Sequence, residues 1–208
     1  MAIIIKDDRW YWPDGVAGDN SWNHQHTSAN LFELIKPHLK GNSTVIQAGG
    51  NCGYVLSQFV PHFRHIYTFE PDPVNFICLT MNVTEPHVIK MQACLGDTVK
   101  MVSISSEIPD IGAFHVDATP GYIPTFKVDD FKLDQCDLIQ LDVEGFEYMA
   151  LKGAEETIRK FRPVICAEWY DQWAYRFGVT RSQWDYFFKG FGYTLVHTEG
   201  NDEIYART

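Results

Sequence analysis

Short apolar runs alternate with longer amphipathic stretches over most of the chain. Runs with the length and β-branched composition of buried strands lie at 44–46, 65–69, 88–92, 137–141 and 163–167. Apolar residues at helical spacing fill the stretches 54–60, 74–82 and 146–160. Strands separated by helices are typical of a mainly parallel sheet with helices on both faces, so the pattern predicts an α/β fold.

The first forty residues do not follow this alternation. Residues 1–26 are rich in Trp, Asp, Gly, Asn and His and predict irregular structure, and a helix is expected from Thr27 or Ser28 towards Lys40. The aromatic run 10–12 would either close over a binding site or only anchor the N-terminus. We therefore expect an N-terminal segment, 1–40, that acts as a lid, followed by a ligand-binding domain over 41–208.

Two more departures from the alternation are predicted further along. Residues 98–128 contain several short β-prone pieces. Near the end, Thr180 and Gln183 have the spacing of a capping box before an aromatic helix that stops at Gly190. The segments 193–197 and 203–206 flank a turn, which predicts a C-terminal antiparallel hairpin.

Composition and charge remove several classes of protein from consideration. The 208 residues carry a formal net charge of −10, which disfavours binding to a nucleic-acid backbone. No apolar run approaches the roughly 18 residues that span a bilayer, and the opening Ala2–Ile5 run is cut short by Lys6. The five cysteines are dispersed, which argues against disulfides and thiolate zinc sites. We expect a cytoplasmic protein without a membrane partner.

A glycine-rich turn after the first predicted strand is the first feature that indicates a ligand. Gly49, Gly50 and Gly53 let the backbone turn tightly and let a ligand approach without meeting a Cβ. Glu70 follows about twenty residues later, at the end of the second strand, where a carboxylate can accept hydrogen bonds from both ribose hydroxyls. The alternative for Glu70 is a position beside a helix N-cap. Together, turn and carboxylate predict a nucleoside-containing ligand.

The spacing of the glycines narrows the choice of ligand. Dinucleotide sites use G-x-G-x-x-G, whereas this chain has G-G-x-x-G and no G-x-x-x-x-G-K-[ST] phosphate loop. This spacing favours a ligand with an amino-acid moiety over one with a pyrophosphate. The sequence therefore predicts S-adenosylmethionine as the cofactor, ahead of a nicotinamide dinucleotide.

Several blocks of sequence, in order, resemble a known family. They are VIQAGGNCGY at 45–54, YTFEPDP at 67–73, DLIQLDVEGFE at 137–147 with LKGA at 151–154, and RPVICAE at 162–168. In this order they resemble the motifs of the FkbM family of S-adenosylmethionine-dependent methyltransferases. The resemblance implies a Rossmann-like class I methyltransferase fold and methyl transfer to a hydroxyl oxygen of a small molecule or glycan.

The resemblance also implies a role for individual residues. The methionine part of the cofactor would be held by Gly49, Gly50, Asn51, Gly53 and Tyr54. Glu70 would hold the ribose, and the adenine would lie near Pro71, Asp72, Ala93 and Cys94. Asp142 and Glu144 would lie closest to the transferred methyl group, and both are the expected catalytic residues, with Asp142 also a cofactor contact.

The chemistry expected of Asp142 follows from its position at the carboxyl end of a central strand, where open α/β sheets bind their ligands. A carboxylate there can attract the cofactor's ammonium group, stabilise its sulfonium or take a proton from an acceptor hydroxyl. Further candidate bases are Glu168, His115, His24 and His26. We expect no metal, because the histidines at 24 and 26 lack a carboxylate at matched spacing.

Three alternatives stay open at this point. Gln47 and Gln140 stand where the family commonly has an acidic residue and a lysine, which favours a cofactor-binding scaffold without transfer activity. A nucleic-acid methyltransferase would need its basic side chains on one face, namely Arg159, Lys160, Arg162, Arg176 and Arg181. The segment 168–173 either lines the acceptor pocket or packs its rings into the core.

Overall fold

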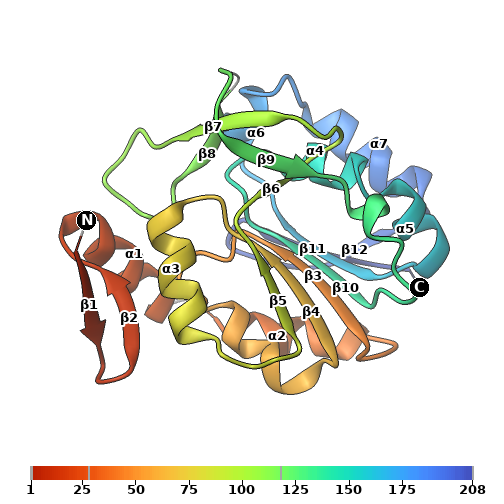
Figure 1. Ribbon diagram of the computed structural model, residues 1–208. Coiled ribbons are helices and arrows are strands. Elements are labelled where there is room, and N and C mark those ends of the chain that lie inside the picture. Colours follow the sequence, from red (N-terminus) through yellow and green to blue (C-terminus); the bar gives the residue numbers. More distant parts are fainter. Residues whose placement is uncertain (1, 28, 118, 208) are drawn as a thin grey trace.

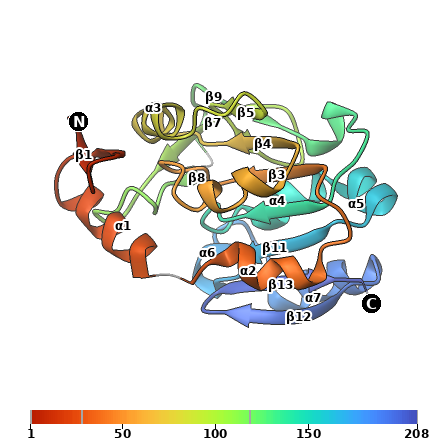
Figure 2. The ribbon, with the colours of Figure 1, turned by 90° about the horizontal axis from the view of Figure 1, so that it is seen from below.

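A computed structural model describes residues 2–27, 29–117 and 119–207, and a seven-stranded sheet runs through its centre (Figure 1). In spatial order the strands are β12 (Thr194–Glu199), β13 (Asp202–Ala206), β11 (Val164–Glu168), β10 (Leu138–Leu141), β3 (Thr44–Ala48), β4 (His65–Phe69) and β5 (Val88–Met91). The five strands from β11 to β5 are parallel, and the β12–β13 hairpin adds antiparallel strands to the β11 edge. Figure 2 shows the strands in this order, from β5 to β12. The predicted parallel sheet and terminal hairpin are confirmed.

Helices cover both faces of this sheet. Successive strand residues point to opposite faces, and both sets are apolar, so each face packs against helices. Ile139 and Leu141 pack with the aromatic side chains of α7 (Arg181–Gly190), whereas Leu138 packs on the other side with α2 (Leu31–Ile35). The first face also carries α4 (Glu147–Lys152) and α5 (Glu155–Phe161), and the second face carries α3 (Pro73–Asn82). The capping box of Thr180 and Gln183 is present at the start of α7.

A second, four-stranded sheet is built from the short β-prone pieces. It contains β6 (Cys94–Leu95), β9 (Ile123–Phe126), β7 (Met101–Ser105) and β8 (His115–Asp117) in that order, and lies above the central sheet in Figure 1. The 3₁₀ helix η4 (Val128–Phe131) leads from β9 back towards the central sheet, and α6 (Asp171–Tyr175) follows β11.

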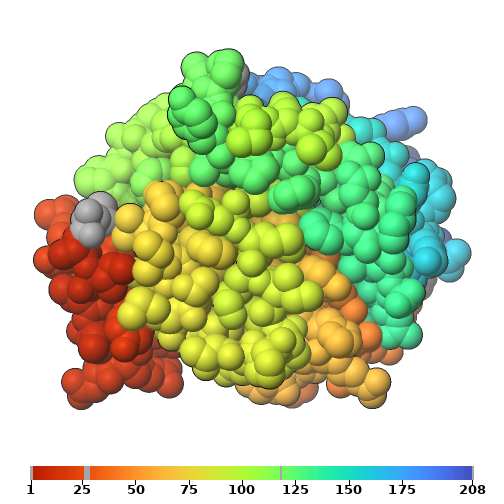
Figure 3. Space-filling model, viewed as in Figure 1, coloured from red at the N-terminus to blue at the C-terminus, as the bar shows by residue number. Residues whose placement is uncertain are grey.

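The prediction of irregular structure for residues 1–26 is wrong. They form a two-stranded sheet, β1 (Ile3–Lys6) with β2 (Trp10–Pro13), followed by α1 (Val16–Thr27). Tertiary contacts account for the difference: Trp12 is fully buried and donates its indole N–H to the Gly18 carbonyl at 2.8 Å. Asn82 of α3 also hydrogen-bonds both backbone groups of Tyr11, at 2.7 and 2.8 Å. The segment packs against α3, as Figure 3 shows in red beside yellow.

The expected helices near the start of the chain are shorter than the pattern predicts. Thr27 is the last residue of α1 rather than the N-cap of this helix, and Ser28 lies outside the described residues. Helix α2 begins after the N-cap Asn30 and gives way to the 3₁₀ helix η1 (Lys36–His38), which contains Pro37. The helix expected over 54–60 is wrong. The 3₁₀ helices η2 (Leu56–Gln58) and η3 (Val60–His62) stand there, and Pro61 cannot donate the hydrogen bond that an α-helix requires.

The single helix expected over 146–160 is two helices. The break falls at Gly153, between α4 and α5. A Cβ at Gly153 would lie 2.0 Å from the Gly96 carbonyl oxygen, so this close approach to the strand β6 region admits only glycine.

Candidate active site

A cavity of about 540 Å³ opens at the carboxyl ends of β3, β4, β10 and β11. Ligand pockets in proteins are usually roughly 300–1,000 Å³, so its size suits a small molecule. Three further segments complete its wall: α1 through Ser21, His24 and Gln25, the loop 110–114, and the hairpin tip 199–202. The sequence does not predict that the loop 110–114 and the hairpin tip 199–202 line this cavity, because nothing in their composition indicates that they approach the carboxyl ends of the strands.

The glycine turn joins three strands at this edge. Gly49 and Gly50 both donate their backbone N–H to the Phe69 carbonyl at 3.0 Å. Gly49 has a φ of +84°, and a Cβ there would lie 1.8 Å from the Asp142 carbonyl oxygen. Both glycines line the cavity, but the space their missing side chains leave is taken by protein atoms. The tight turn is therefore required by the packing of β3 against β10.

Glu70 stands next to this turn, on the floor of the cavity. It is 4% exposed, and its carboxylate accepts hydrogen bonds from the backbone N–H of Asn51 at 2.7 Å and of Asp72 at 2.8 Å. A carboxylate has about four lone-pair positions, so it retains capacity for further donors. Burial raises the pKa of Glu70 to about 8.

Other residues expected at the cofactor are divided by the structure. Asn51, Pro71, Ala93 and Cys94 line the cavity with Glu70 and the two glycines. Burial raises the pKa of Cys94 to about 12, so its thiol stays neutral.

Gly53, Tyr54 and Asp72 are not among the residues that line the cavity. A Cβ at Gly53 would meet Val83 and Leu79 of the α3 region at 2.9–3.0 Å. The Tyr54 ring lies 5.2 Å from that of Trp10, and the Asp72 carboxylate caps α3 by accepting from the Val74 and Asn75 N–H groups at 2.9 Å.

Two glutamines on the neighbouring strands β3 and β10 differ in their hydrogen bonds. The Gln47 amide donates to the Gly49 carbonyl at 2.9 Å and accepts from the Thr68 hydroxyl, so it holds the glycine turn in place. Gln140 is 1% exposed and lines the cavity, and its side-chain oxygen has no hydrogen-bond partner among the residues that the structure describes.

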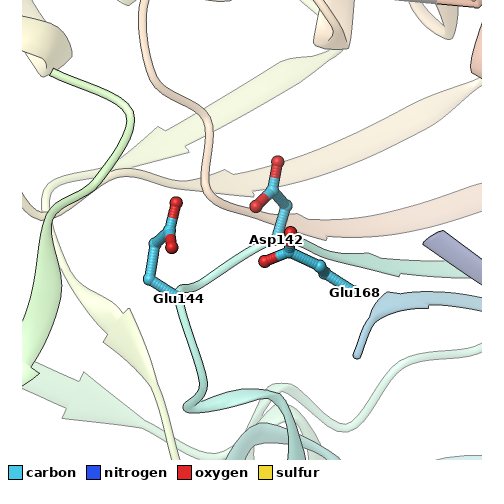
Figure 4. A group of neighbouring side chains, drawn as sticks. All are labelled: Asp142, Glu144 and Glu168. Carbon is cyan, nitrogen blue, oxygen red and sulfur yellow. The ribbon is translucent and has the colours of Figure 1, made fainter. Parts of the chain in front are cut away.

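Three carboxylates gather at the ends of β10 and β11. Leu141 pairs with Ala167, so the next residues, Asp142 and Glu168, lie side by side. Glu144 faces them from the loop after β10, where the chain turns through left-handed conformations at Glu144 and Gly145, with φ of +55° and +99° (Figure 4). Oxygens of the three side chains lie within 4.8 Å of one another. The sequence does not reveal this grouping, because Glu168 lies in a different motif.

The electrostatics of this acidic cluster, Asp142, Glu144 and Glu168, disfavour its negative charge. Burial, followed by the charge of Asp142, raises the pKa of Glu144 to about 9 and that of Glu168 to about 10. Burial also raises the pKa of Asp142. The Asp142 side chain is exposed, but only to the cavity, whose protein walls still reduce its hydration.

The acidic cluster meets one positive charge at Asp142, because His24 acts on that carboxyl and partly offsets the rise that burial causes in its pKa. Arg176 forms its salt bridge with Glu107 at 2.9 Å and lies over the Trp173 ring. Asn201 donates to one Glu168 oxygen at 3.4 Å, and the other oxygen is buried without a partner in the described part of the chain.

The remaining candidate bases are separated by the structure. His24 lines the cavity, whereas His115 does not; it is buried, with Ser105 at 3.3 Å from its Nε2. Nothing is described of the His26 side chain. In the segment 168–173, Glu168 and Trp173 line the cavity while the Trp169 ring packs 4.9 Å from that of Trp184 in the core. The segment therefore divides between the cavity wall and the core, and its role towards an acceptor stays a prediction.

Solved structures share this architecture at low sequence identity. The FkbM methyltransferase of Methylobacillus flagellatus matches with a TM-score of 0.57 and 17% identity over 88% of this chain, which spans only 50% of that chain. The structure of CalS10 with S-adenosylmethionine bound, an amino pentose methyltransferase from Micromonospora echinaspora, matches with a TM-score of 0.54 and 10% identity. The match covers 94% of this chain and 99% of that chain. A TehB-like S-adenosylmethionine-dependent methyltransferase from Corynebacterium glutamicum matches with a TM-score of 0.52 and 10% identity. The match covers 91% of this chain and 96% of that chain.

The strand order, the turn after β3 and the carboxylate after β4 define a Rossmann-like class I methyltransferase fold, as the sequence predicts. The chain belongs to the FkbM methyltransferase family, because residues 47–195 match the Methyltransferase FkbM domain. This membership confirms the resemblance and supports S-adenosylmethionine as the cofactor. No curated protein matches the chain significantly. Among the described residues, no helix has the length and apolar character needed to cross a membrane.

Proposed function

We propose that the chain methylates a hydroxyl oxygen of a small molecule or glycan, with S-adenosylmethionine as the methyl donor. The observation that carries this proposal is one cavity lined both by Glu70 with the glycine turn, which we call the cofactor end, and by the acidic cluster, which we call the acceptor end. One end offers a buried acceptor for ribose hydroxyls, and the other offers carboxylates beside a reacting hydroxyl.

The residues at the first end fit the cofactor. Glu70 presents a buried carboxylate with spare acceptor capacity, and Asn51 and Pro71 stand on either side of it. We assign the ribose to Glu70, the adenine to the wall formed by Pro71, Ala93 and Cys94, and the methionine part to the turn 49–51. Gly53, Tyr54 and Asp72 would support these contacts from behind, through the packing and capping described above.

The acidic cluster would serve the acceptor. When bound, the cofactor supplies a methyl group on a positively charged sulfur, and transfer to an acceptor oxygen leaves the carbon–sulfur electron pair on that sulfur. Asp142 or Glu144 would accept the hydroxyl proton as the new carbon–oxygen bond forms. The cavity walls would hold donor and acceptor in line, and such positioning contributes most when the donor is already activated.

Three further expectations fit the same arrangement. We propose that the N-terminal segment 1–40 closes one side of the site, since Ser21, His24 and Gln25 of α1 line the cavity. A nucleic-acid acceptor is disfavoured by the net charge of −10, and two of the five basic side chains it would use, Arg176 and Arg181, are each paired with a carboxylate. A cytoplasmic location is supported by the five cysteines, which are all buried and free.

A transfer assay tests the proposal. The full chain would be incubated with methyl-tritiated S-adenosylmethionine and a panel of sugars and hydroxylated small molecules, each paired with its O-methylated counterpart as a control. We expect label in the hydroxyl compound only, with a methyl ether as the product. Cofactor binding without transfer to any compound would favour the scaffold alternative, and transfer to amines alone would refute the oxygen acceptor.

A further inference from the structure

The acidic cluster has the composition of a cation site. Asp142, Glu144 and Glu168 place oxygens within 4.8 Å of one another, and they reach that point from two strands and a left-handed turn. Carboxylate oxygens are the ligands that magnesium, manganese and calcium ions prefer. Two oxygens on opposite sides of such an ion are about 4.0–5.2 Å apart, so the spacing suits one shared ion.

A second observation, independent of the carboxylates, points to a ligand at the same place. Gln140 lies in β10 and Asp142 directly follows that strand two residues later, with its N–H still bonded to the Ala48 carbonyl of β3, so alternation places both side chains on the same face. Gln140 is 1% exposed, faces the same cavity, and has a side-chain oxygen without a donor in the described ranges. A buried amide oxygen without a partner is costly, because it has lost its hydrogen bonds to water. A water molecule on a bound cation would supply the missing donor.

The charge balance favours a divalent ion over a protonated amine. The cluster carries three negative charges when ionised, and no lysine or arginine within the described ranges forms a salt bridge with it. The charge of His24 acts on Asp142 and that of Arg176 on Glu144, and Arg176 also forms a salt bridge with Glu107. An ammonium group neutralises one charge, whereas a divalent ion neutralises two and accepts oxygens from all three side chains.

We propose that Asp142, Glu144 and Glu168 bind one divalent cation with oxygen preference, at the acceptor end of the cavity. The cation holds an acceptor hydroxyl in place and lowers its pKa, and the carboxylate oxygen of Asp142 or Glu144 that does not bind the ion accepts the proton. That role in transfer rests on the proposed function, but the binding of the ion does not. All three proposed ligands are carboxylates, so this site differs from the metal-binding spacing of the histidines at 24 and 26.

The test is a titration of the full chain with manganese, in which the concentration of the free ion is measured by electron paramagnetic resonance. Wild type should bind one manganese ion per chain. Glu168→Gln and Asp142→Asn should each weaken that binding about tenfold or more. The matched control is Glu199→Gln, which removes one carboxylate from the cavity rim outside the cluster and should leave the affinity within about twofold. Circular dichroism and thermal unfolding verify that each variant is folded, and if one variant fails to fold the other decides.

Each remaining outcome has a single meaning. A wild-type chain that binds S-adenosylhomocysteine but no manganese overturns the cation site and leaves the proposed function standing. Manganese binding that neither substitution weakens places the ion elsewhere and also overturns it. Binding of ethylammonium in place of manganese would assign the cluster to an amine. If S-adenosylhomocysteine fails to bind while manganese behaves as expected, the proposed function fails and the cation site stands.

Discussion

The two ends of the cavity treat their buried carboxylates differently. At the cofactor end, Glu70 accepts two backbone N–H groups at 2.7 and 2.8 Å, and those donors belong to the turn and the helix start that frame it. At the acceptor end, Glu168 has one weak donor at 3.4 Å and one oxygen without a partner in the described chain. Glu70 is therefore held in place by two hydrogen bonds, whereas the acidic cluster has few hydrogen-bond donors to stabilise its negative charge.

This difference indicates that the two ends are prepared for different ligands. A fixed carboxylate with spare acceptor capacity suits neutral hydroxyl donors, whose position matters more than their charge. A cluster of three carboxylates whose oxygens lie within 4.8 Å of one another, with few donors beside it, suits a proton or a cation. The ends meet where Gly49 packs against the backbone of Asp142, so their relative position is set by a backbone contact.

The largest expected effect is on the rate of transfer. Asp142→Asn removes a charge from the acceptor end and should lower single-turnover methyl transfer by roughly 10²–10⁴-fold, the usual contribution of a positioned acid–base group. Asp134→Asn, at an exposed position, is the matched control and should leave the rate unchanged. Rapid-quench measurement with saturating cofactor gives the rate, and normal transfer in Asp142→Asn would remove this residue from the chemistry.

The contact between the two ends predicts the next largest effect, on stability. Gly49→Ala should destabilise the fold by about 3 kcal/mol or more, because its Cβ would overlap the Asp142 carbonyl in a left-handed conformation. Gly178→Ala has a similar φ of +69° with no atom within 4 Å of the new Cβ, and should cost only about 1–2 kcal/mol. Chemical denaturation compares the two, and equal losses would show that the contact contributes nothing.

A smaller effect is expected on cofactor affinity. Glu70→Ala removes charge-assisted hydrogen bonds to the ribose and should weaken S-adenosylhomocysteine binding by about 1.5–3 kcal/mol, or roughly 10- to 150-fold. Glu85→Ala, which removes an exposed carboxylate after α3, serves as the control for charge. An affinity in Glu70→Ala equal to that of Glu85→Ala would exclude Glu70 from the ribose site.

The smallest predicted effect concerns pH. Burial raises the pKa of Glu70 from its ordinary value of 4.5 to about 8, so the protonated form predominates below pH 8 in the protein without cofactor. The ionised form accepts ribose hydroxyls better, so affinity should rise by up to about tenfold between pH 6.5 and 8.5. The same shift makes Glu70 reduce the stability of the free protein as pH rises from 4.5 towards 8. Calorimetry across this range should give a flat profile for Glu70→Gln.

Much of the fold follows from local sequence. The buried strands, the helix after Asp72 and the hairpin at the end carry their own signals in apolar runs, caps and turns. The N-terminal strands were missed because they depend on contacts distant in sequence, such as Asn82 with Tyr11. The 3₁₀ helices η2 and η3 replace the expected helix for a local reason, since Pro61 lacks the N–H that a continued α-helix needs and the apolar pattern carries no sign of this.

The site was predictable where its residues share a motif. Glu70 and the glycine turn stand at the cavity as their spacing indicates. Asp142 and Glu168 meet only through the register of β10 with β11, and the sequence contains no direct record of that register. Gln47 likewise departs from the family pattern, and only the structure shows its amide bracing the turn through Gly49 and Thr68.

The most direct test of the division between the two ends is a calorimetric titration with S-adenosylhomocysteine. It compares the wild type with Glu70→Ala and with Glu144→Gln. We predict binding by the wild type, at least about tenfold weaker binding by Glu70→Ala, and an affinity within about threefold of the wild type for Glu144→Gln. Absence of binding by the wild type, or equal losses in the two variants, would contradict the assignment of cofactor and acceptor to separate ends.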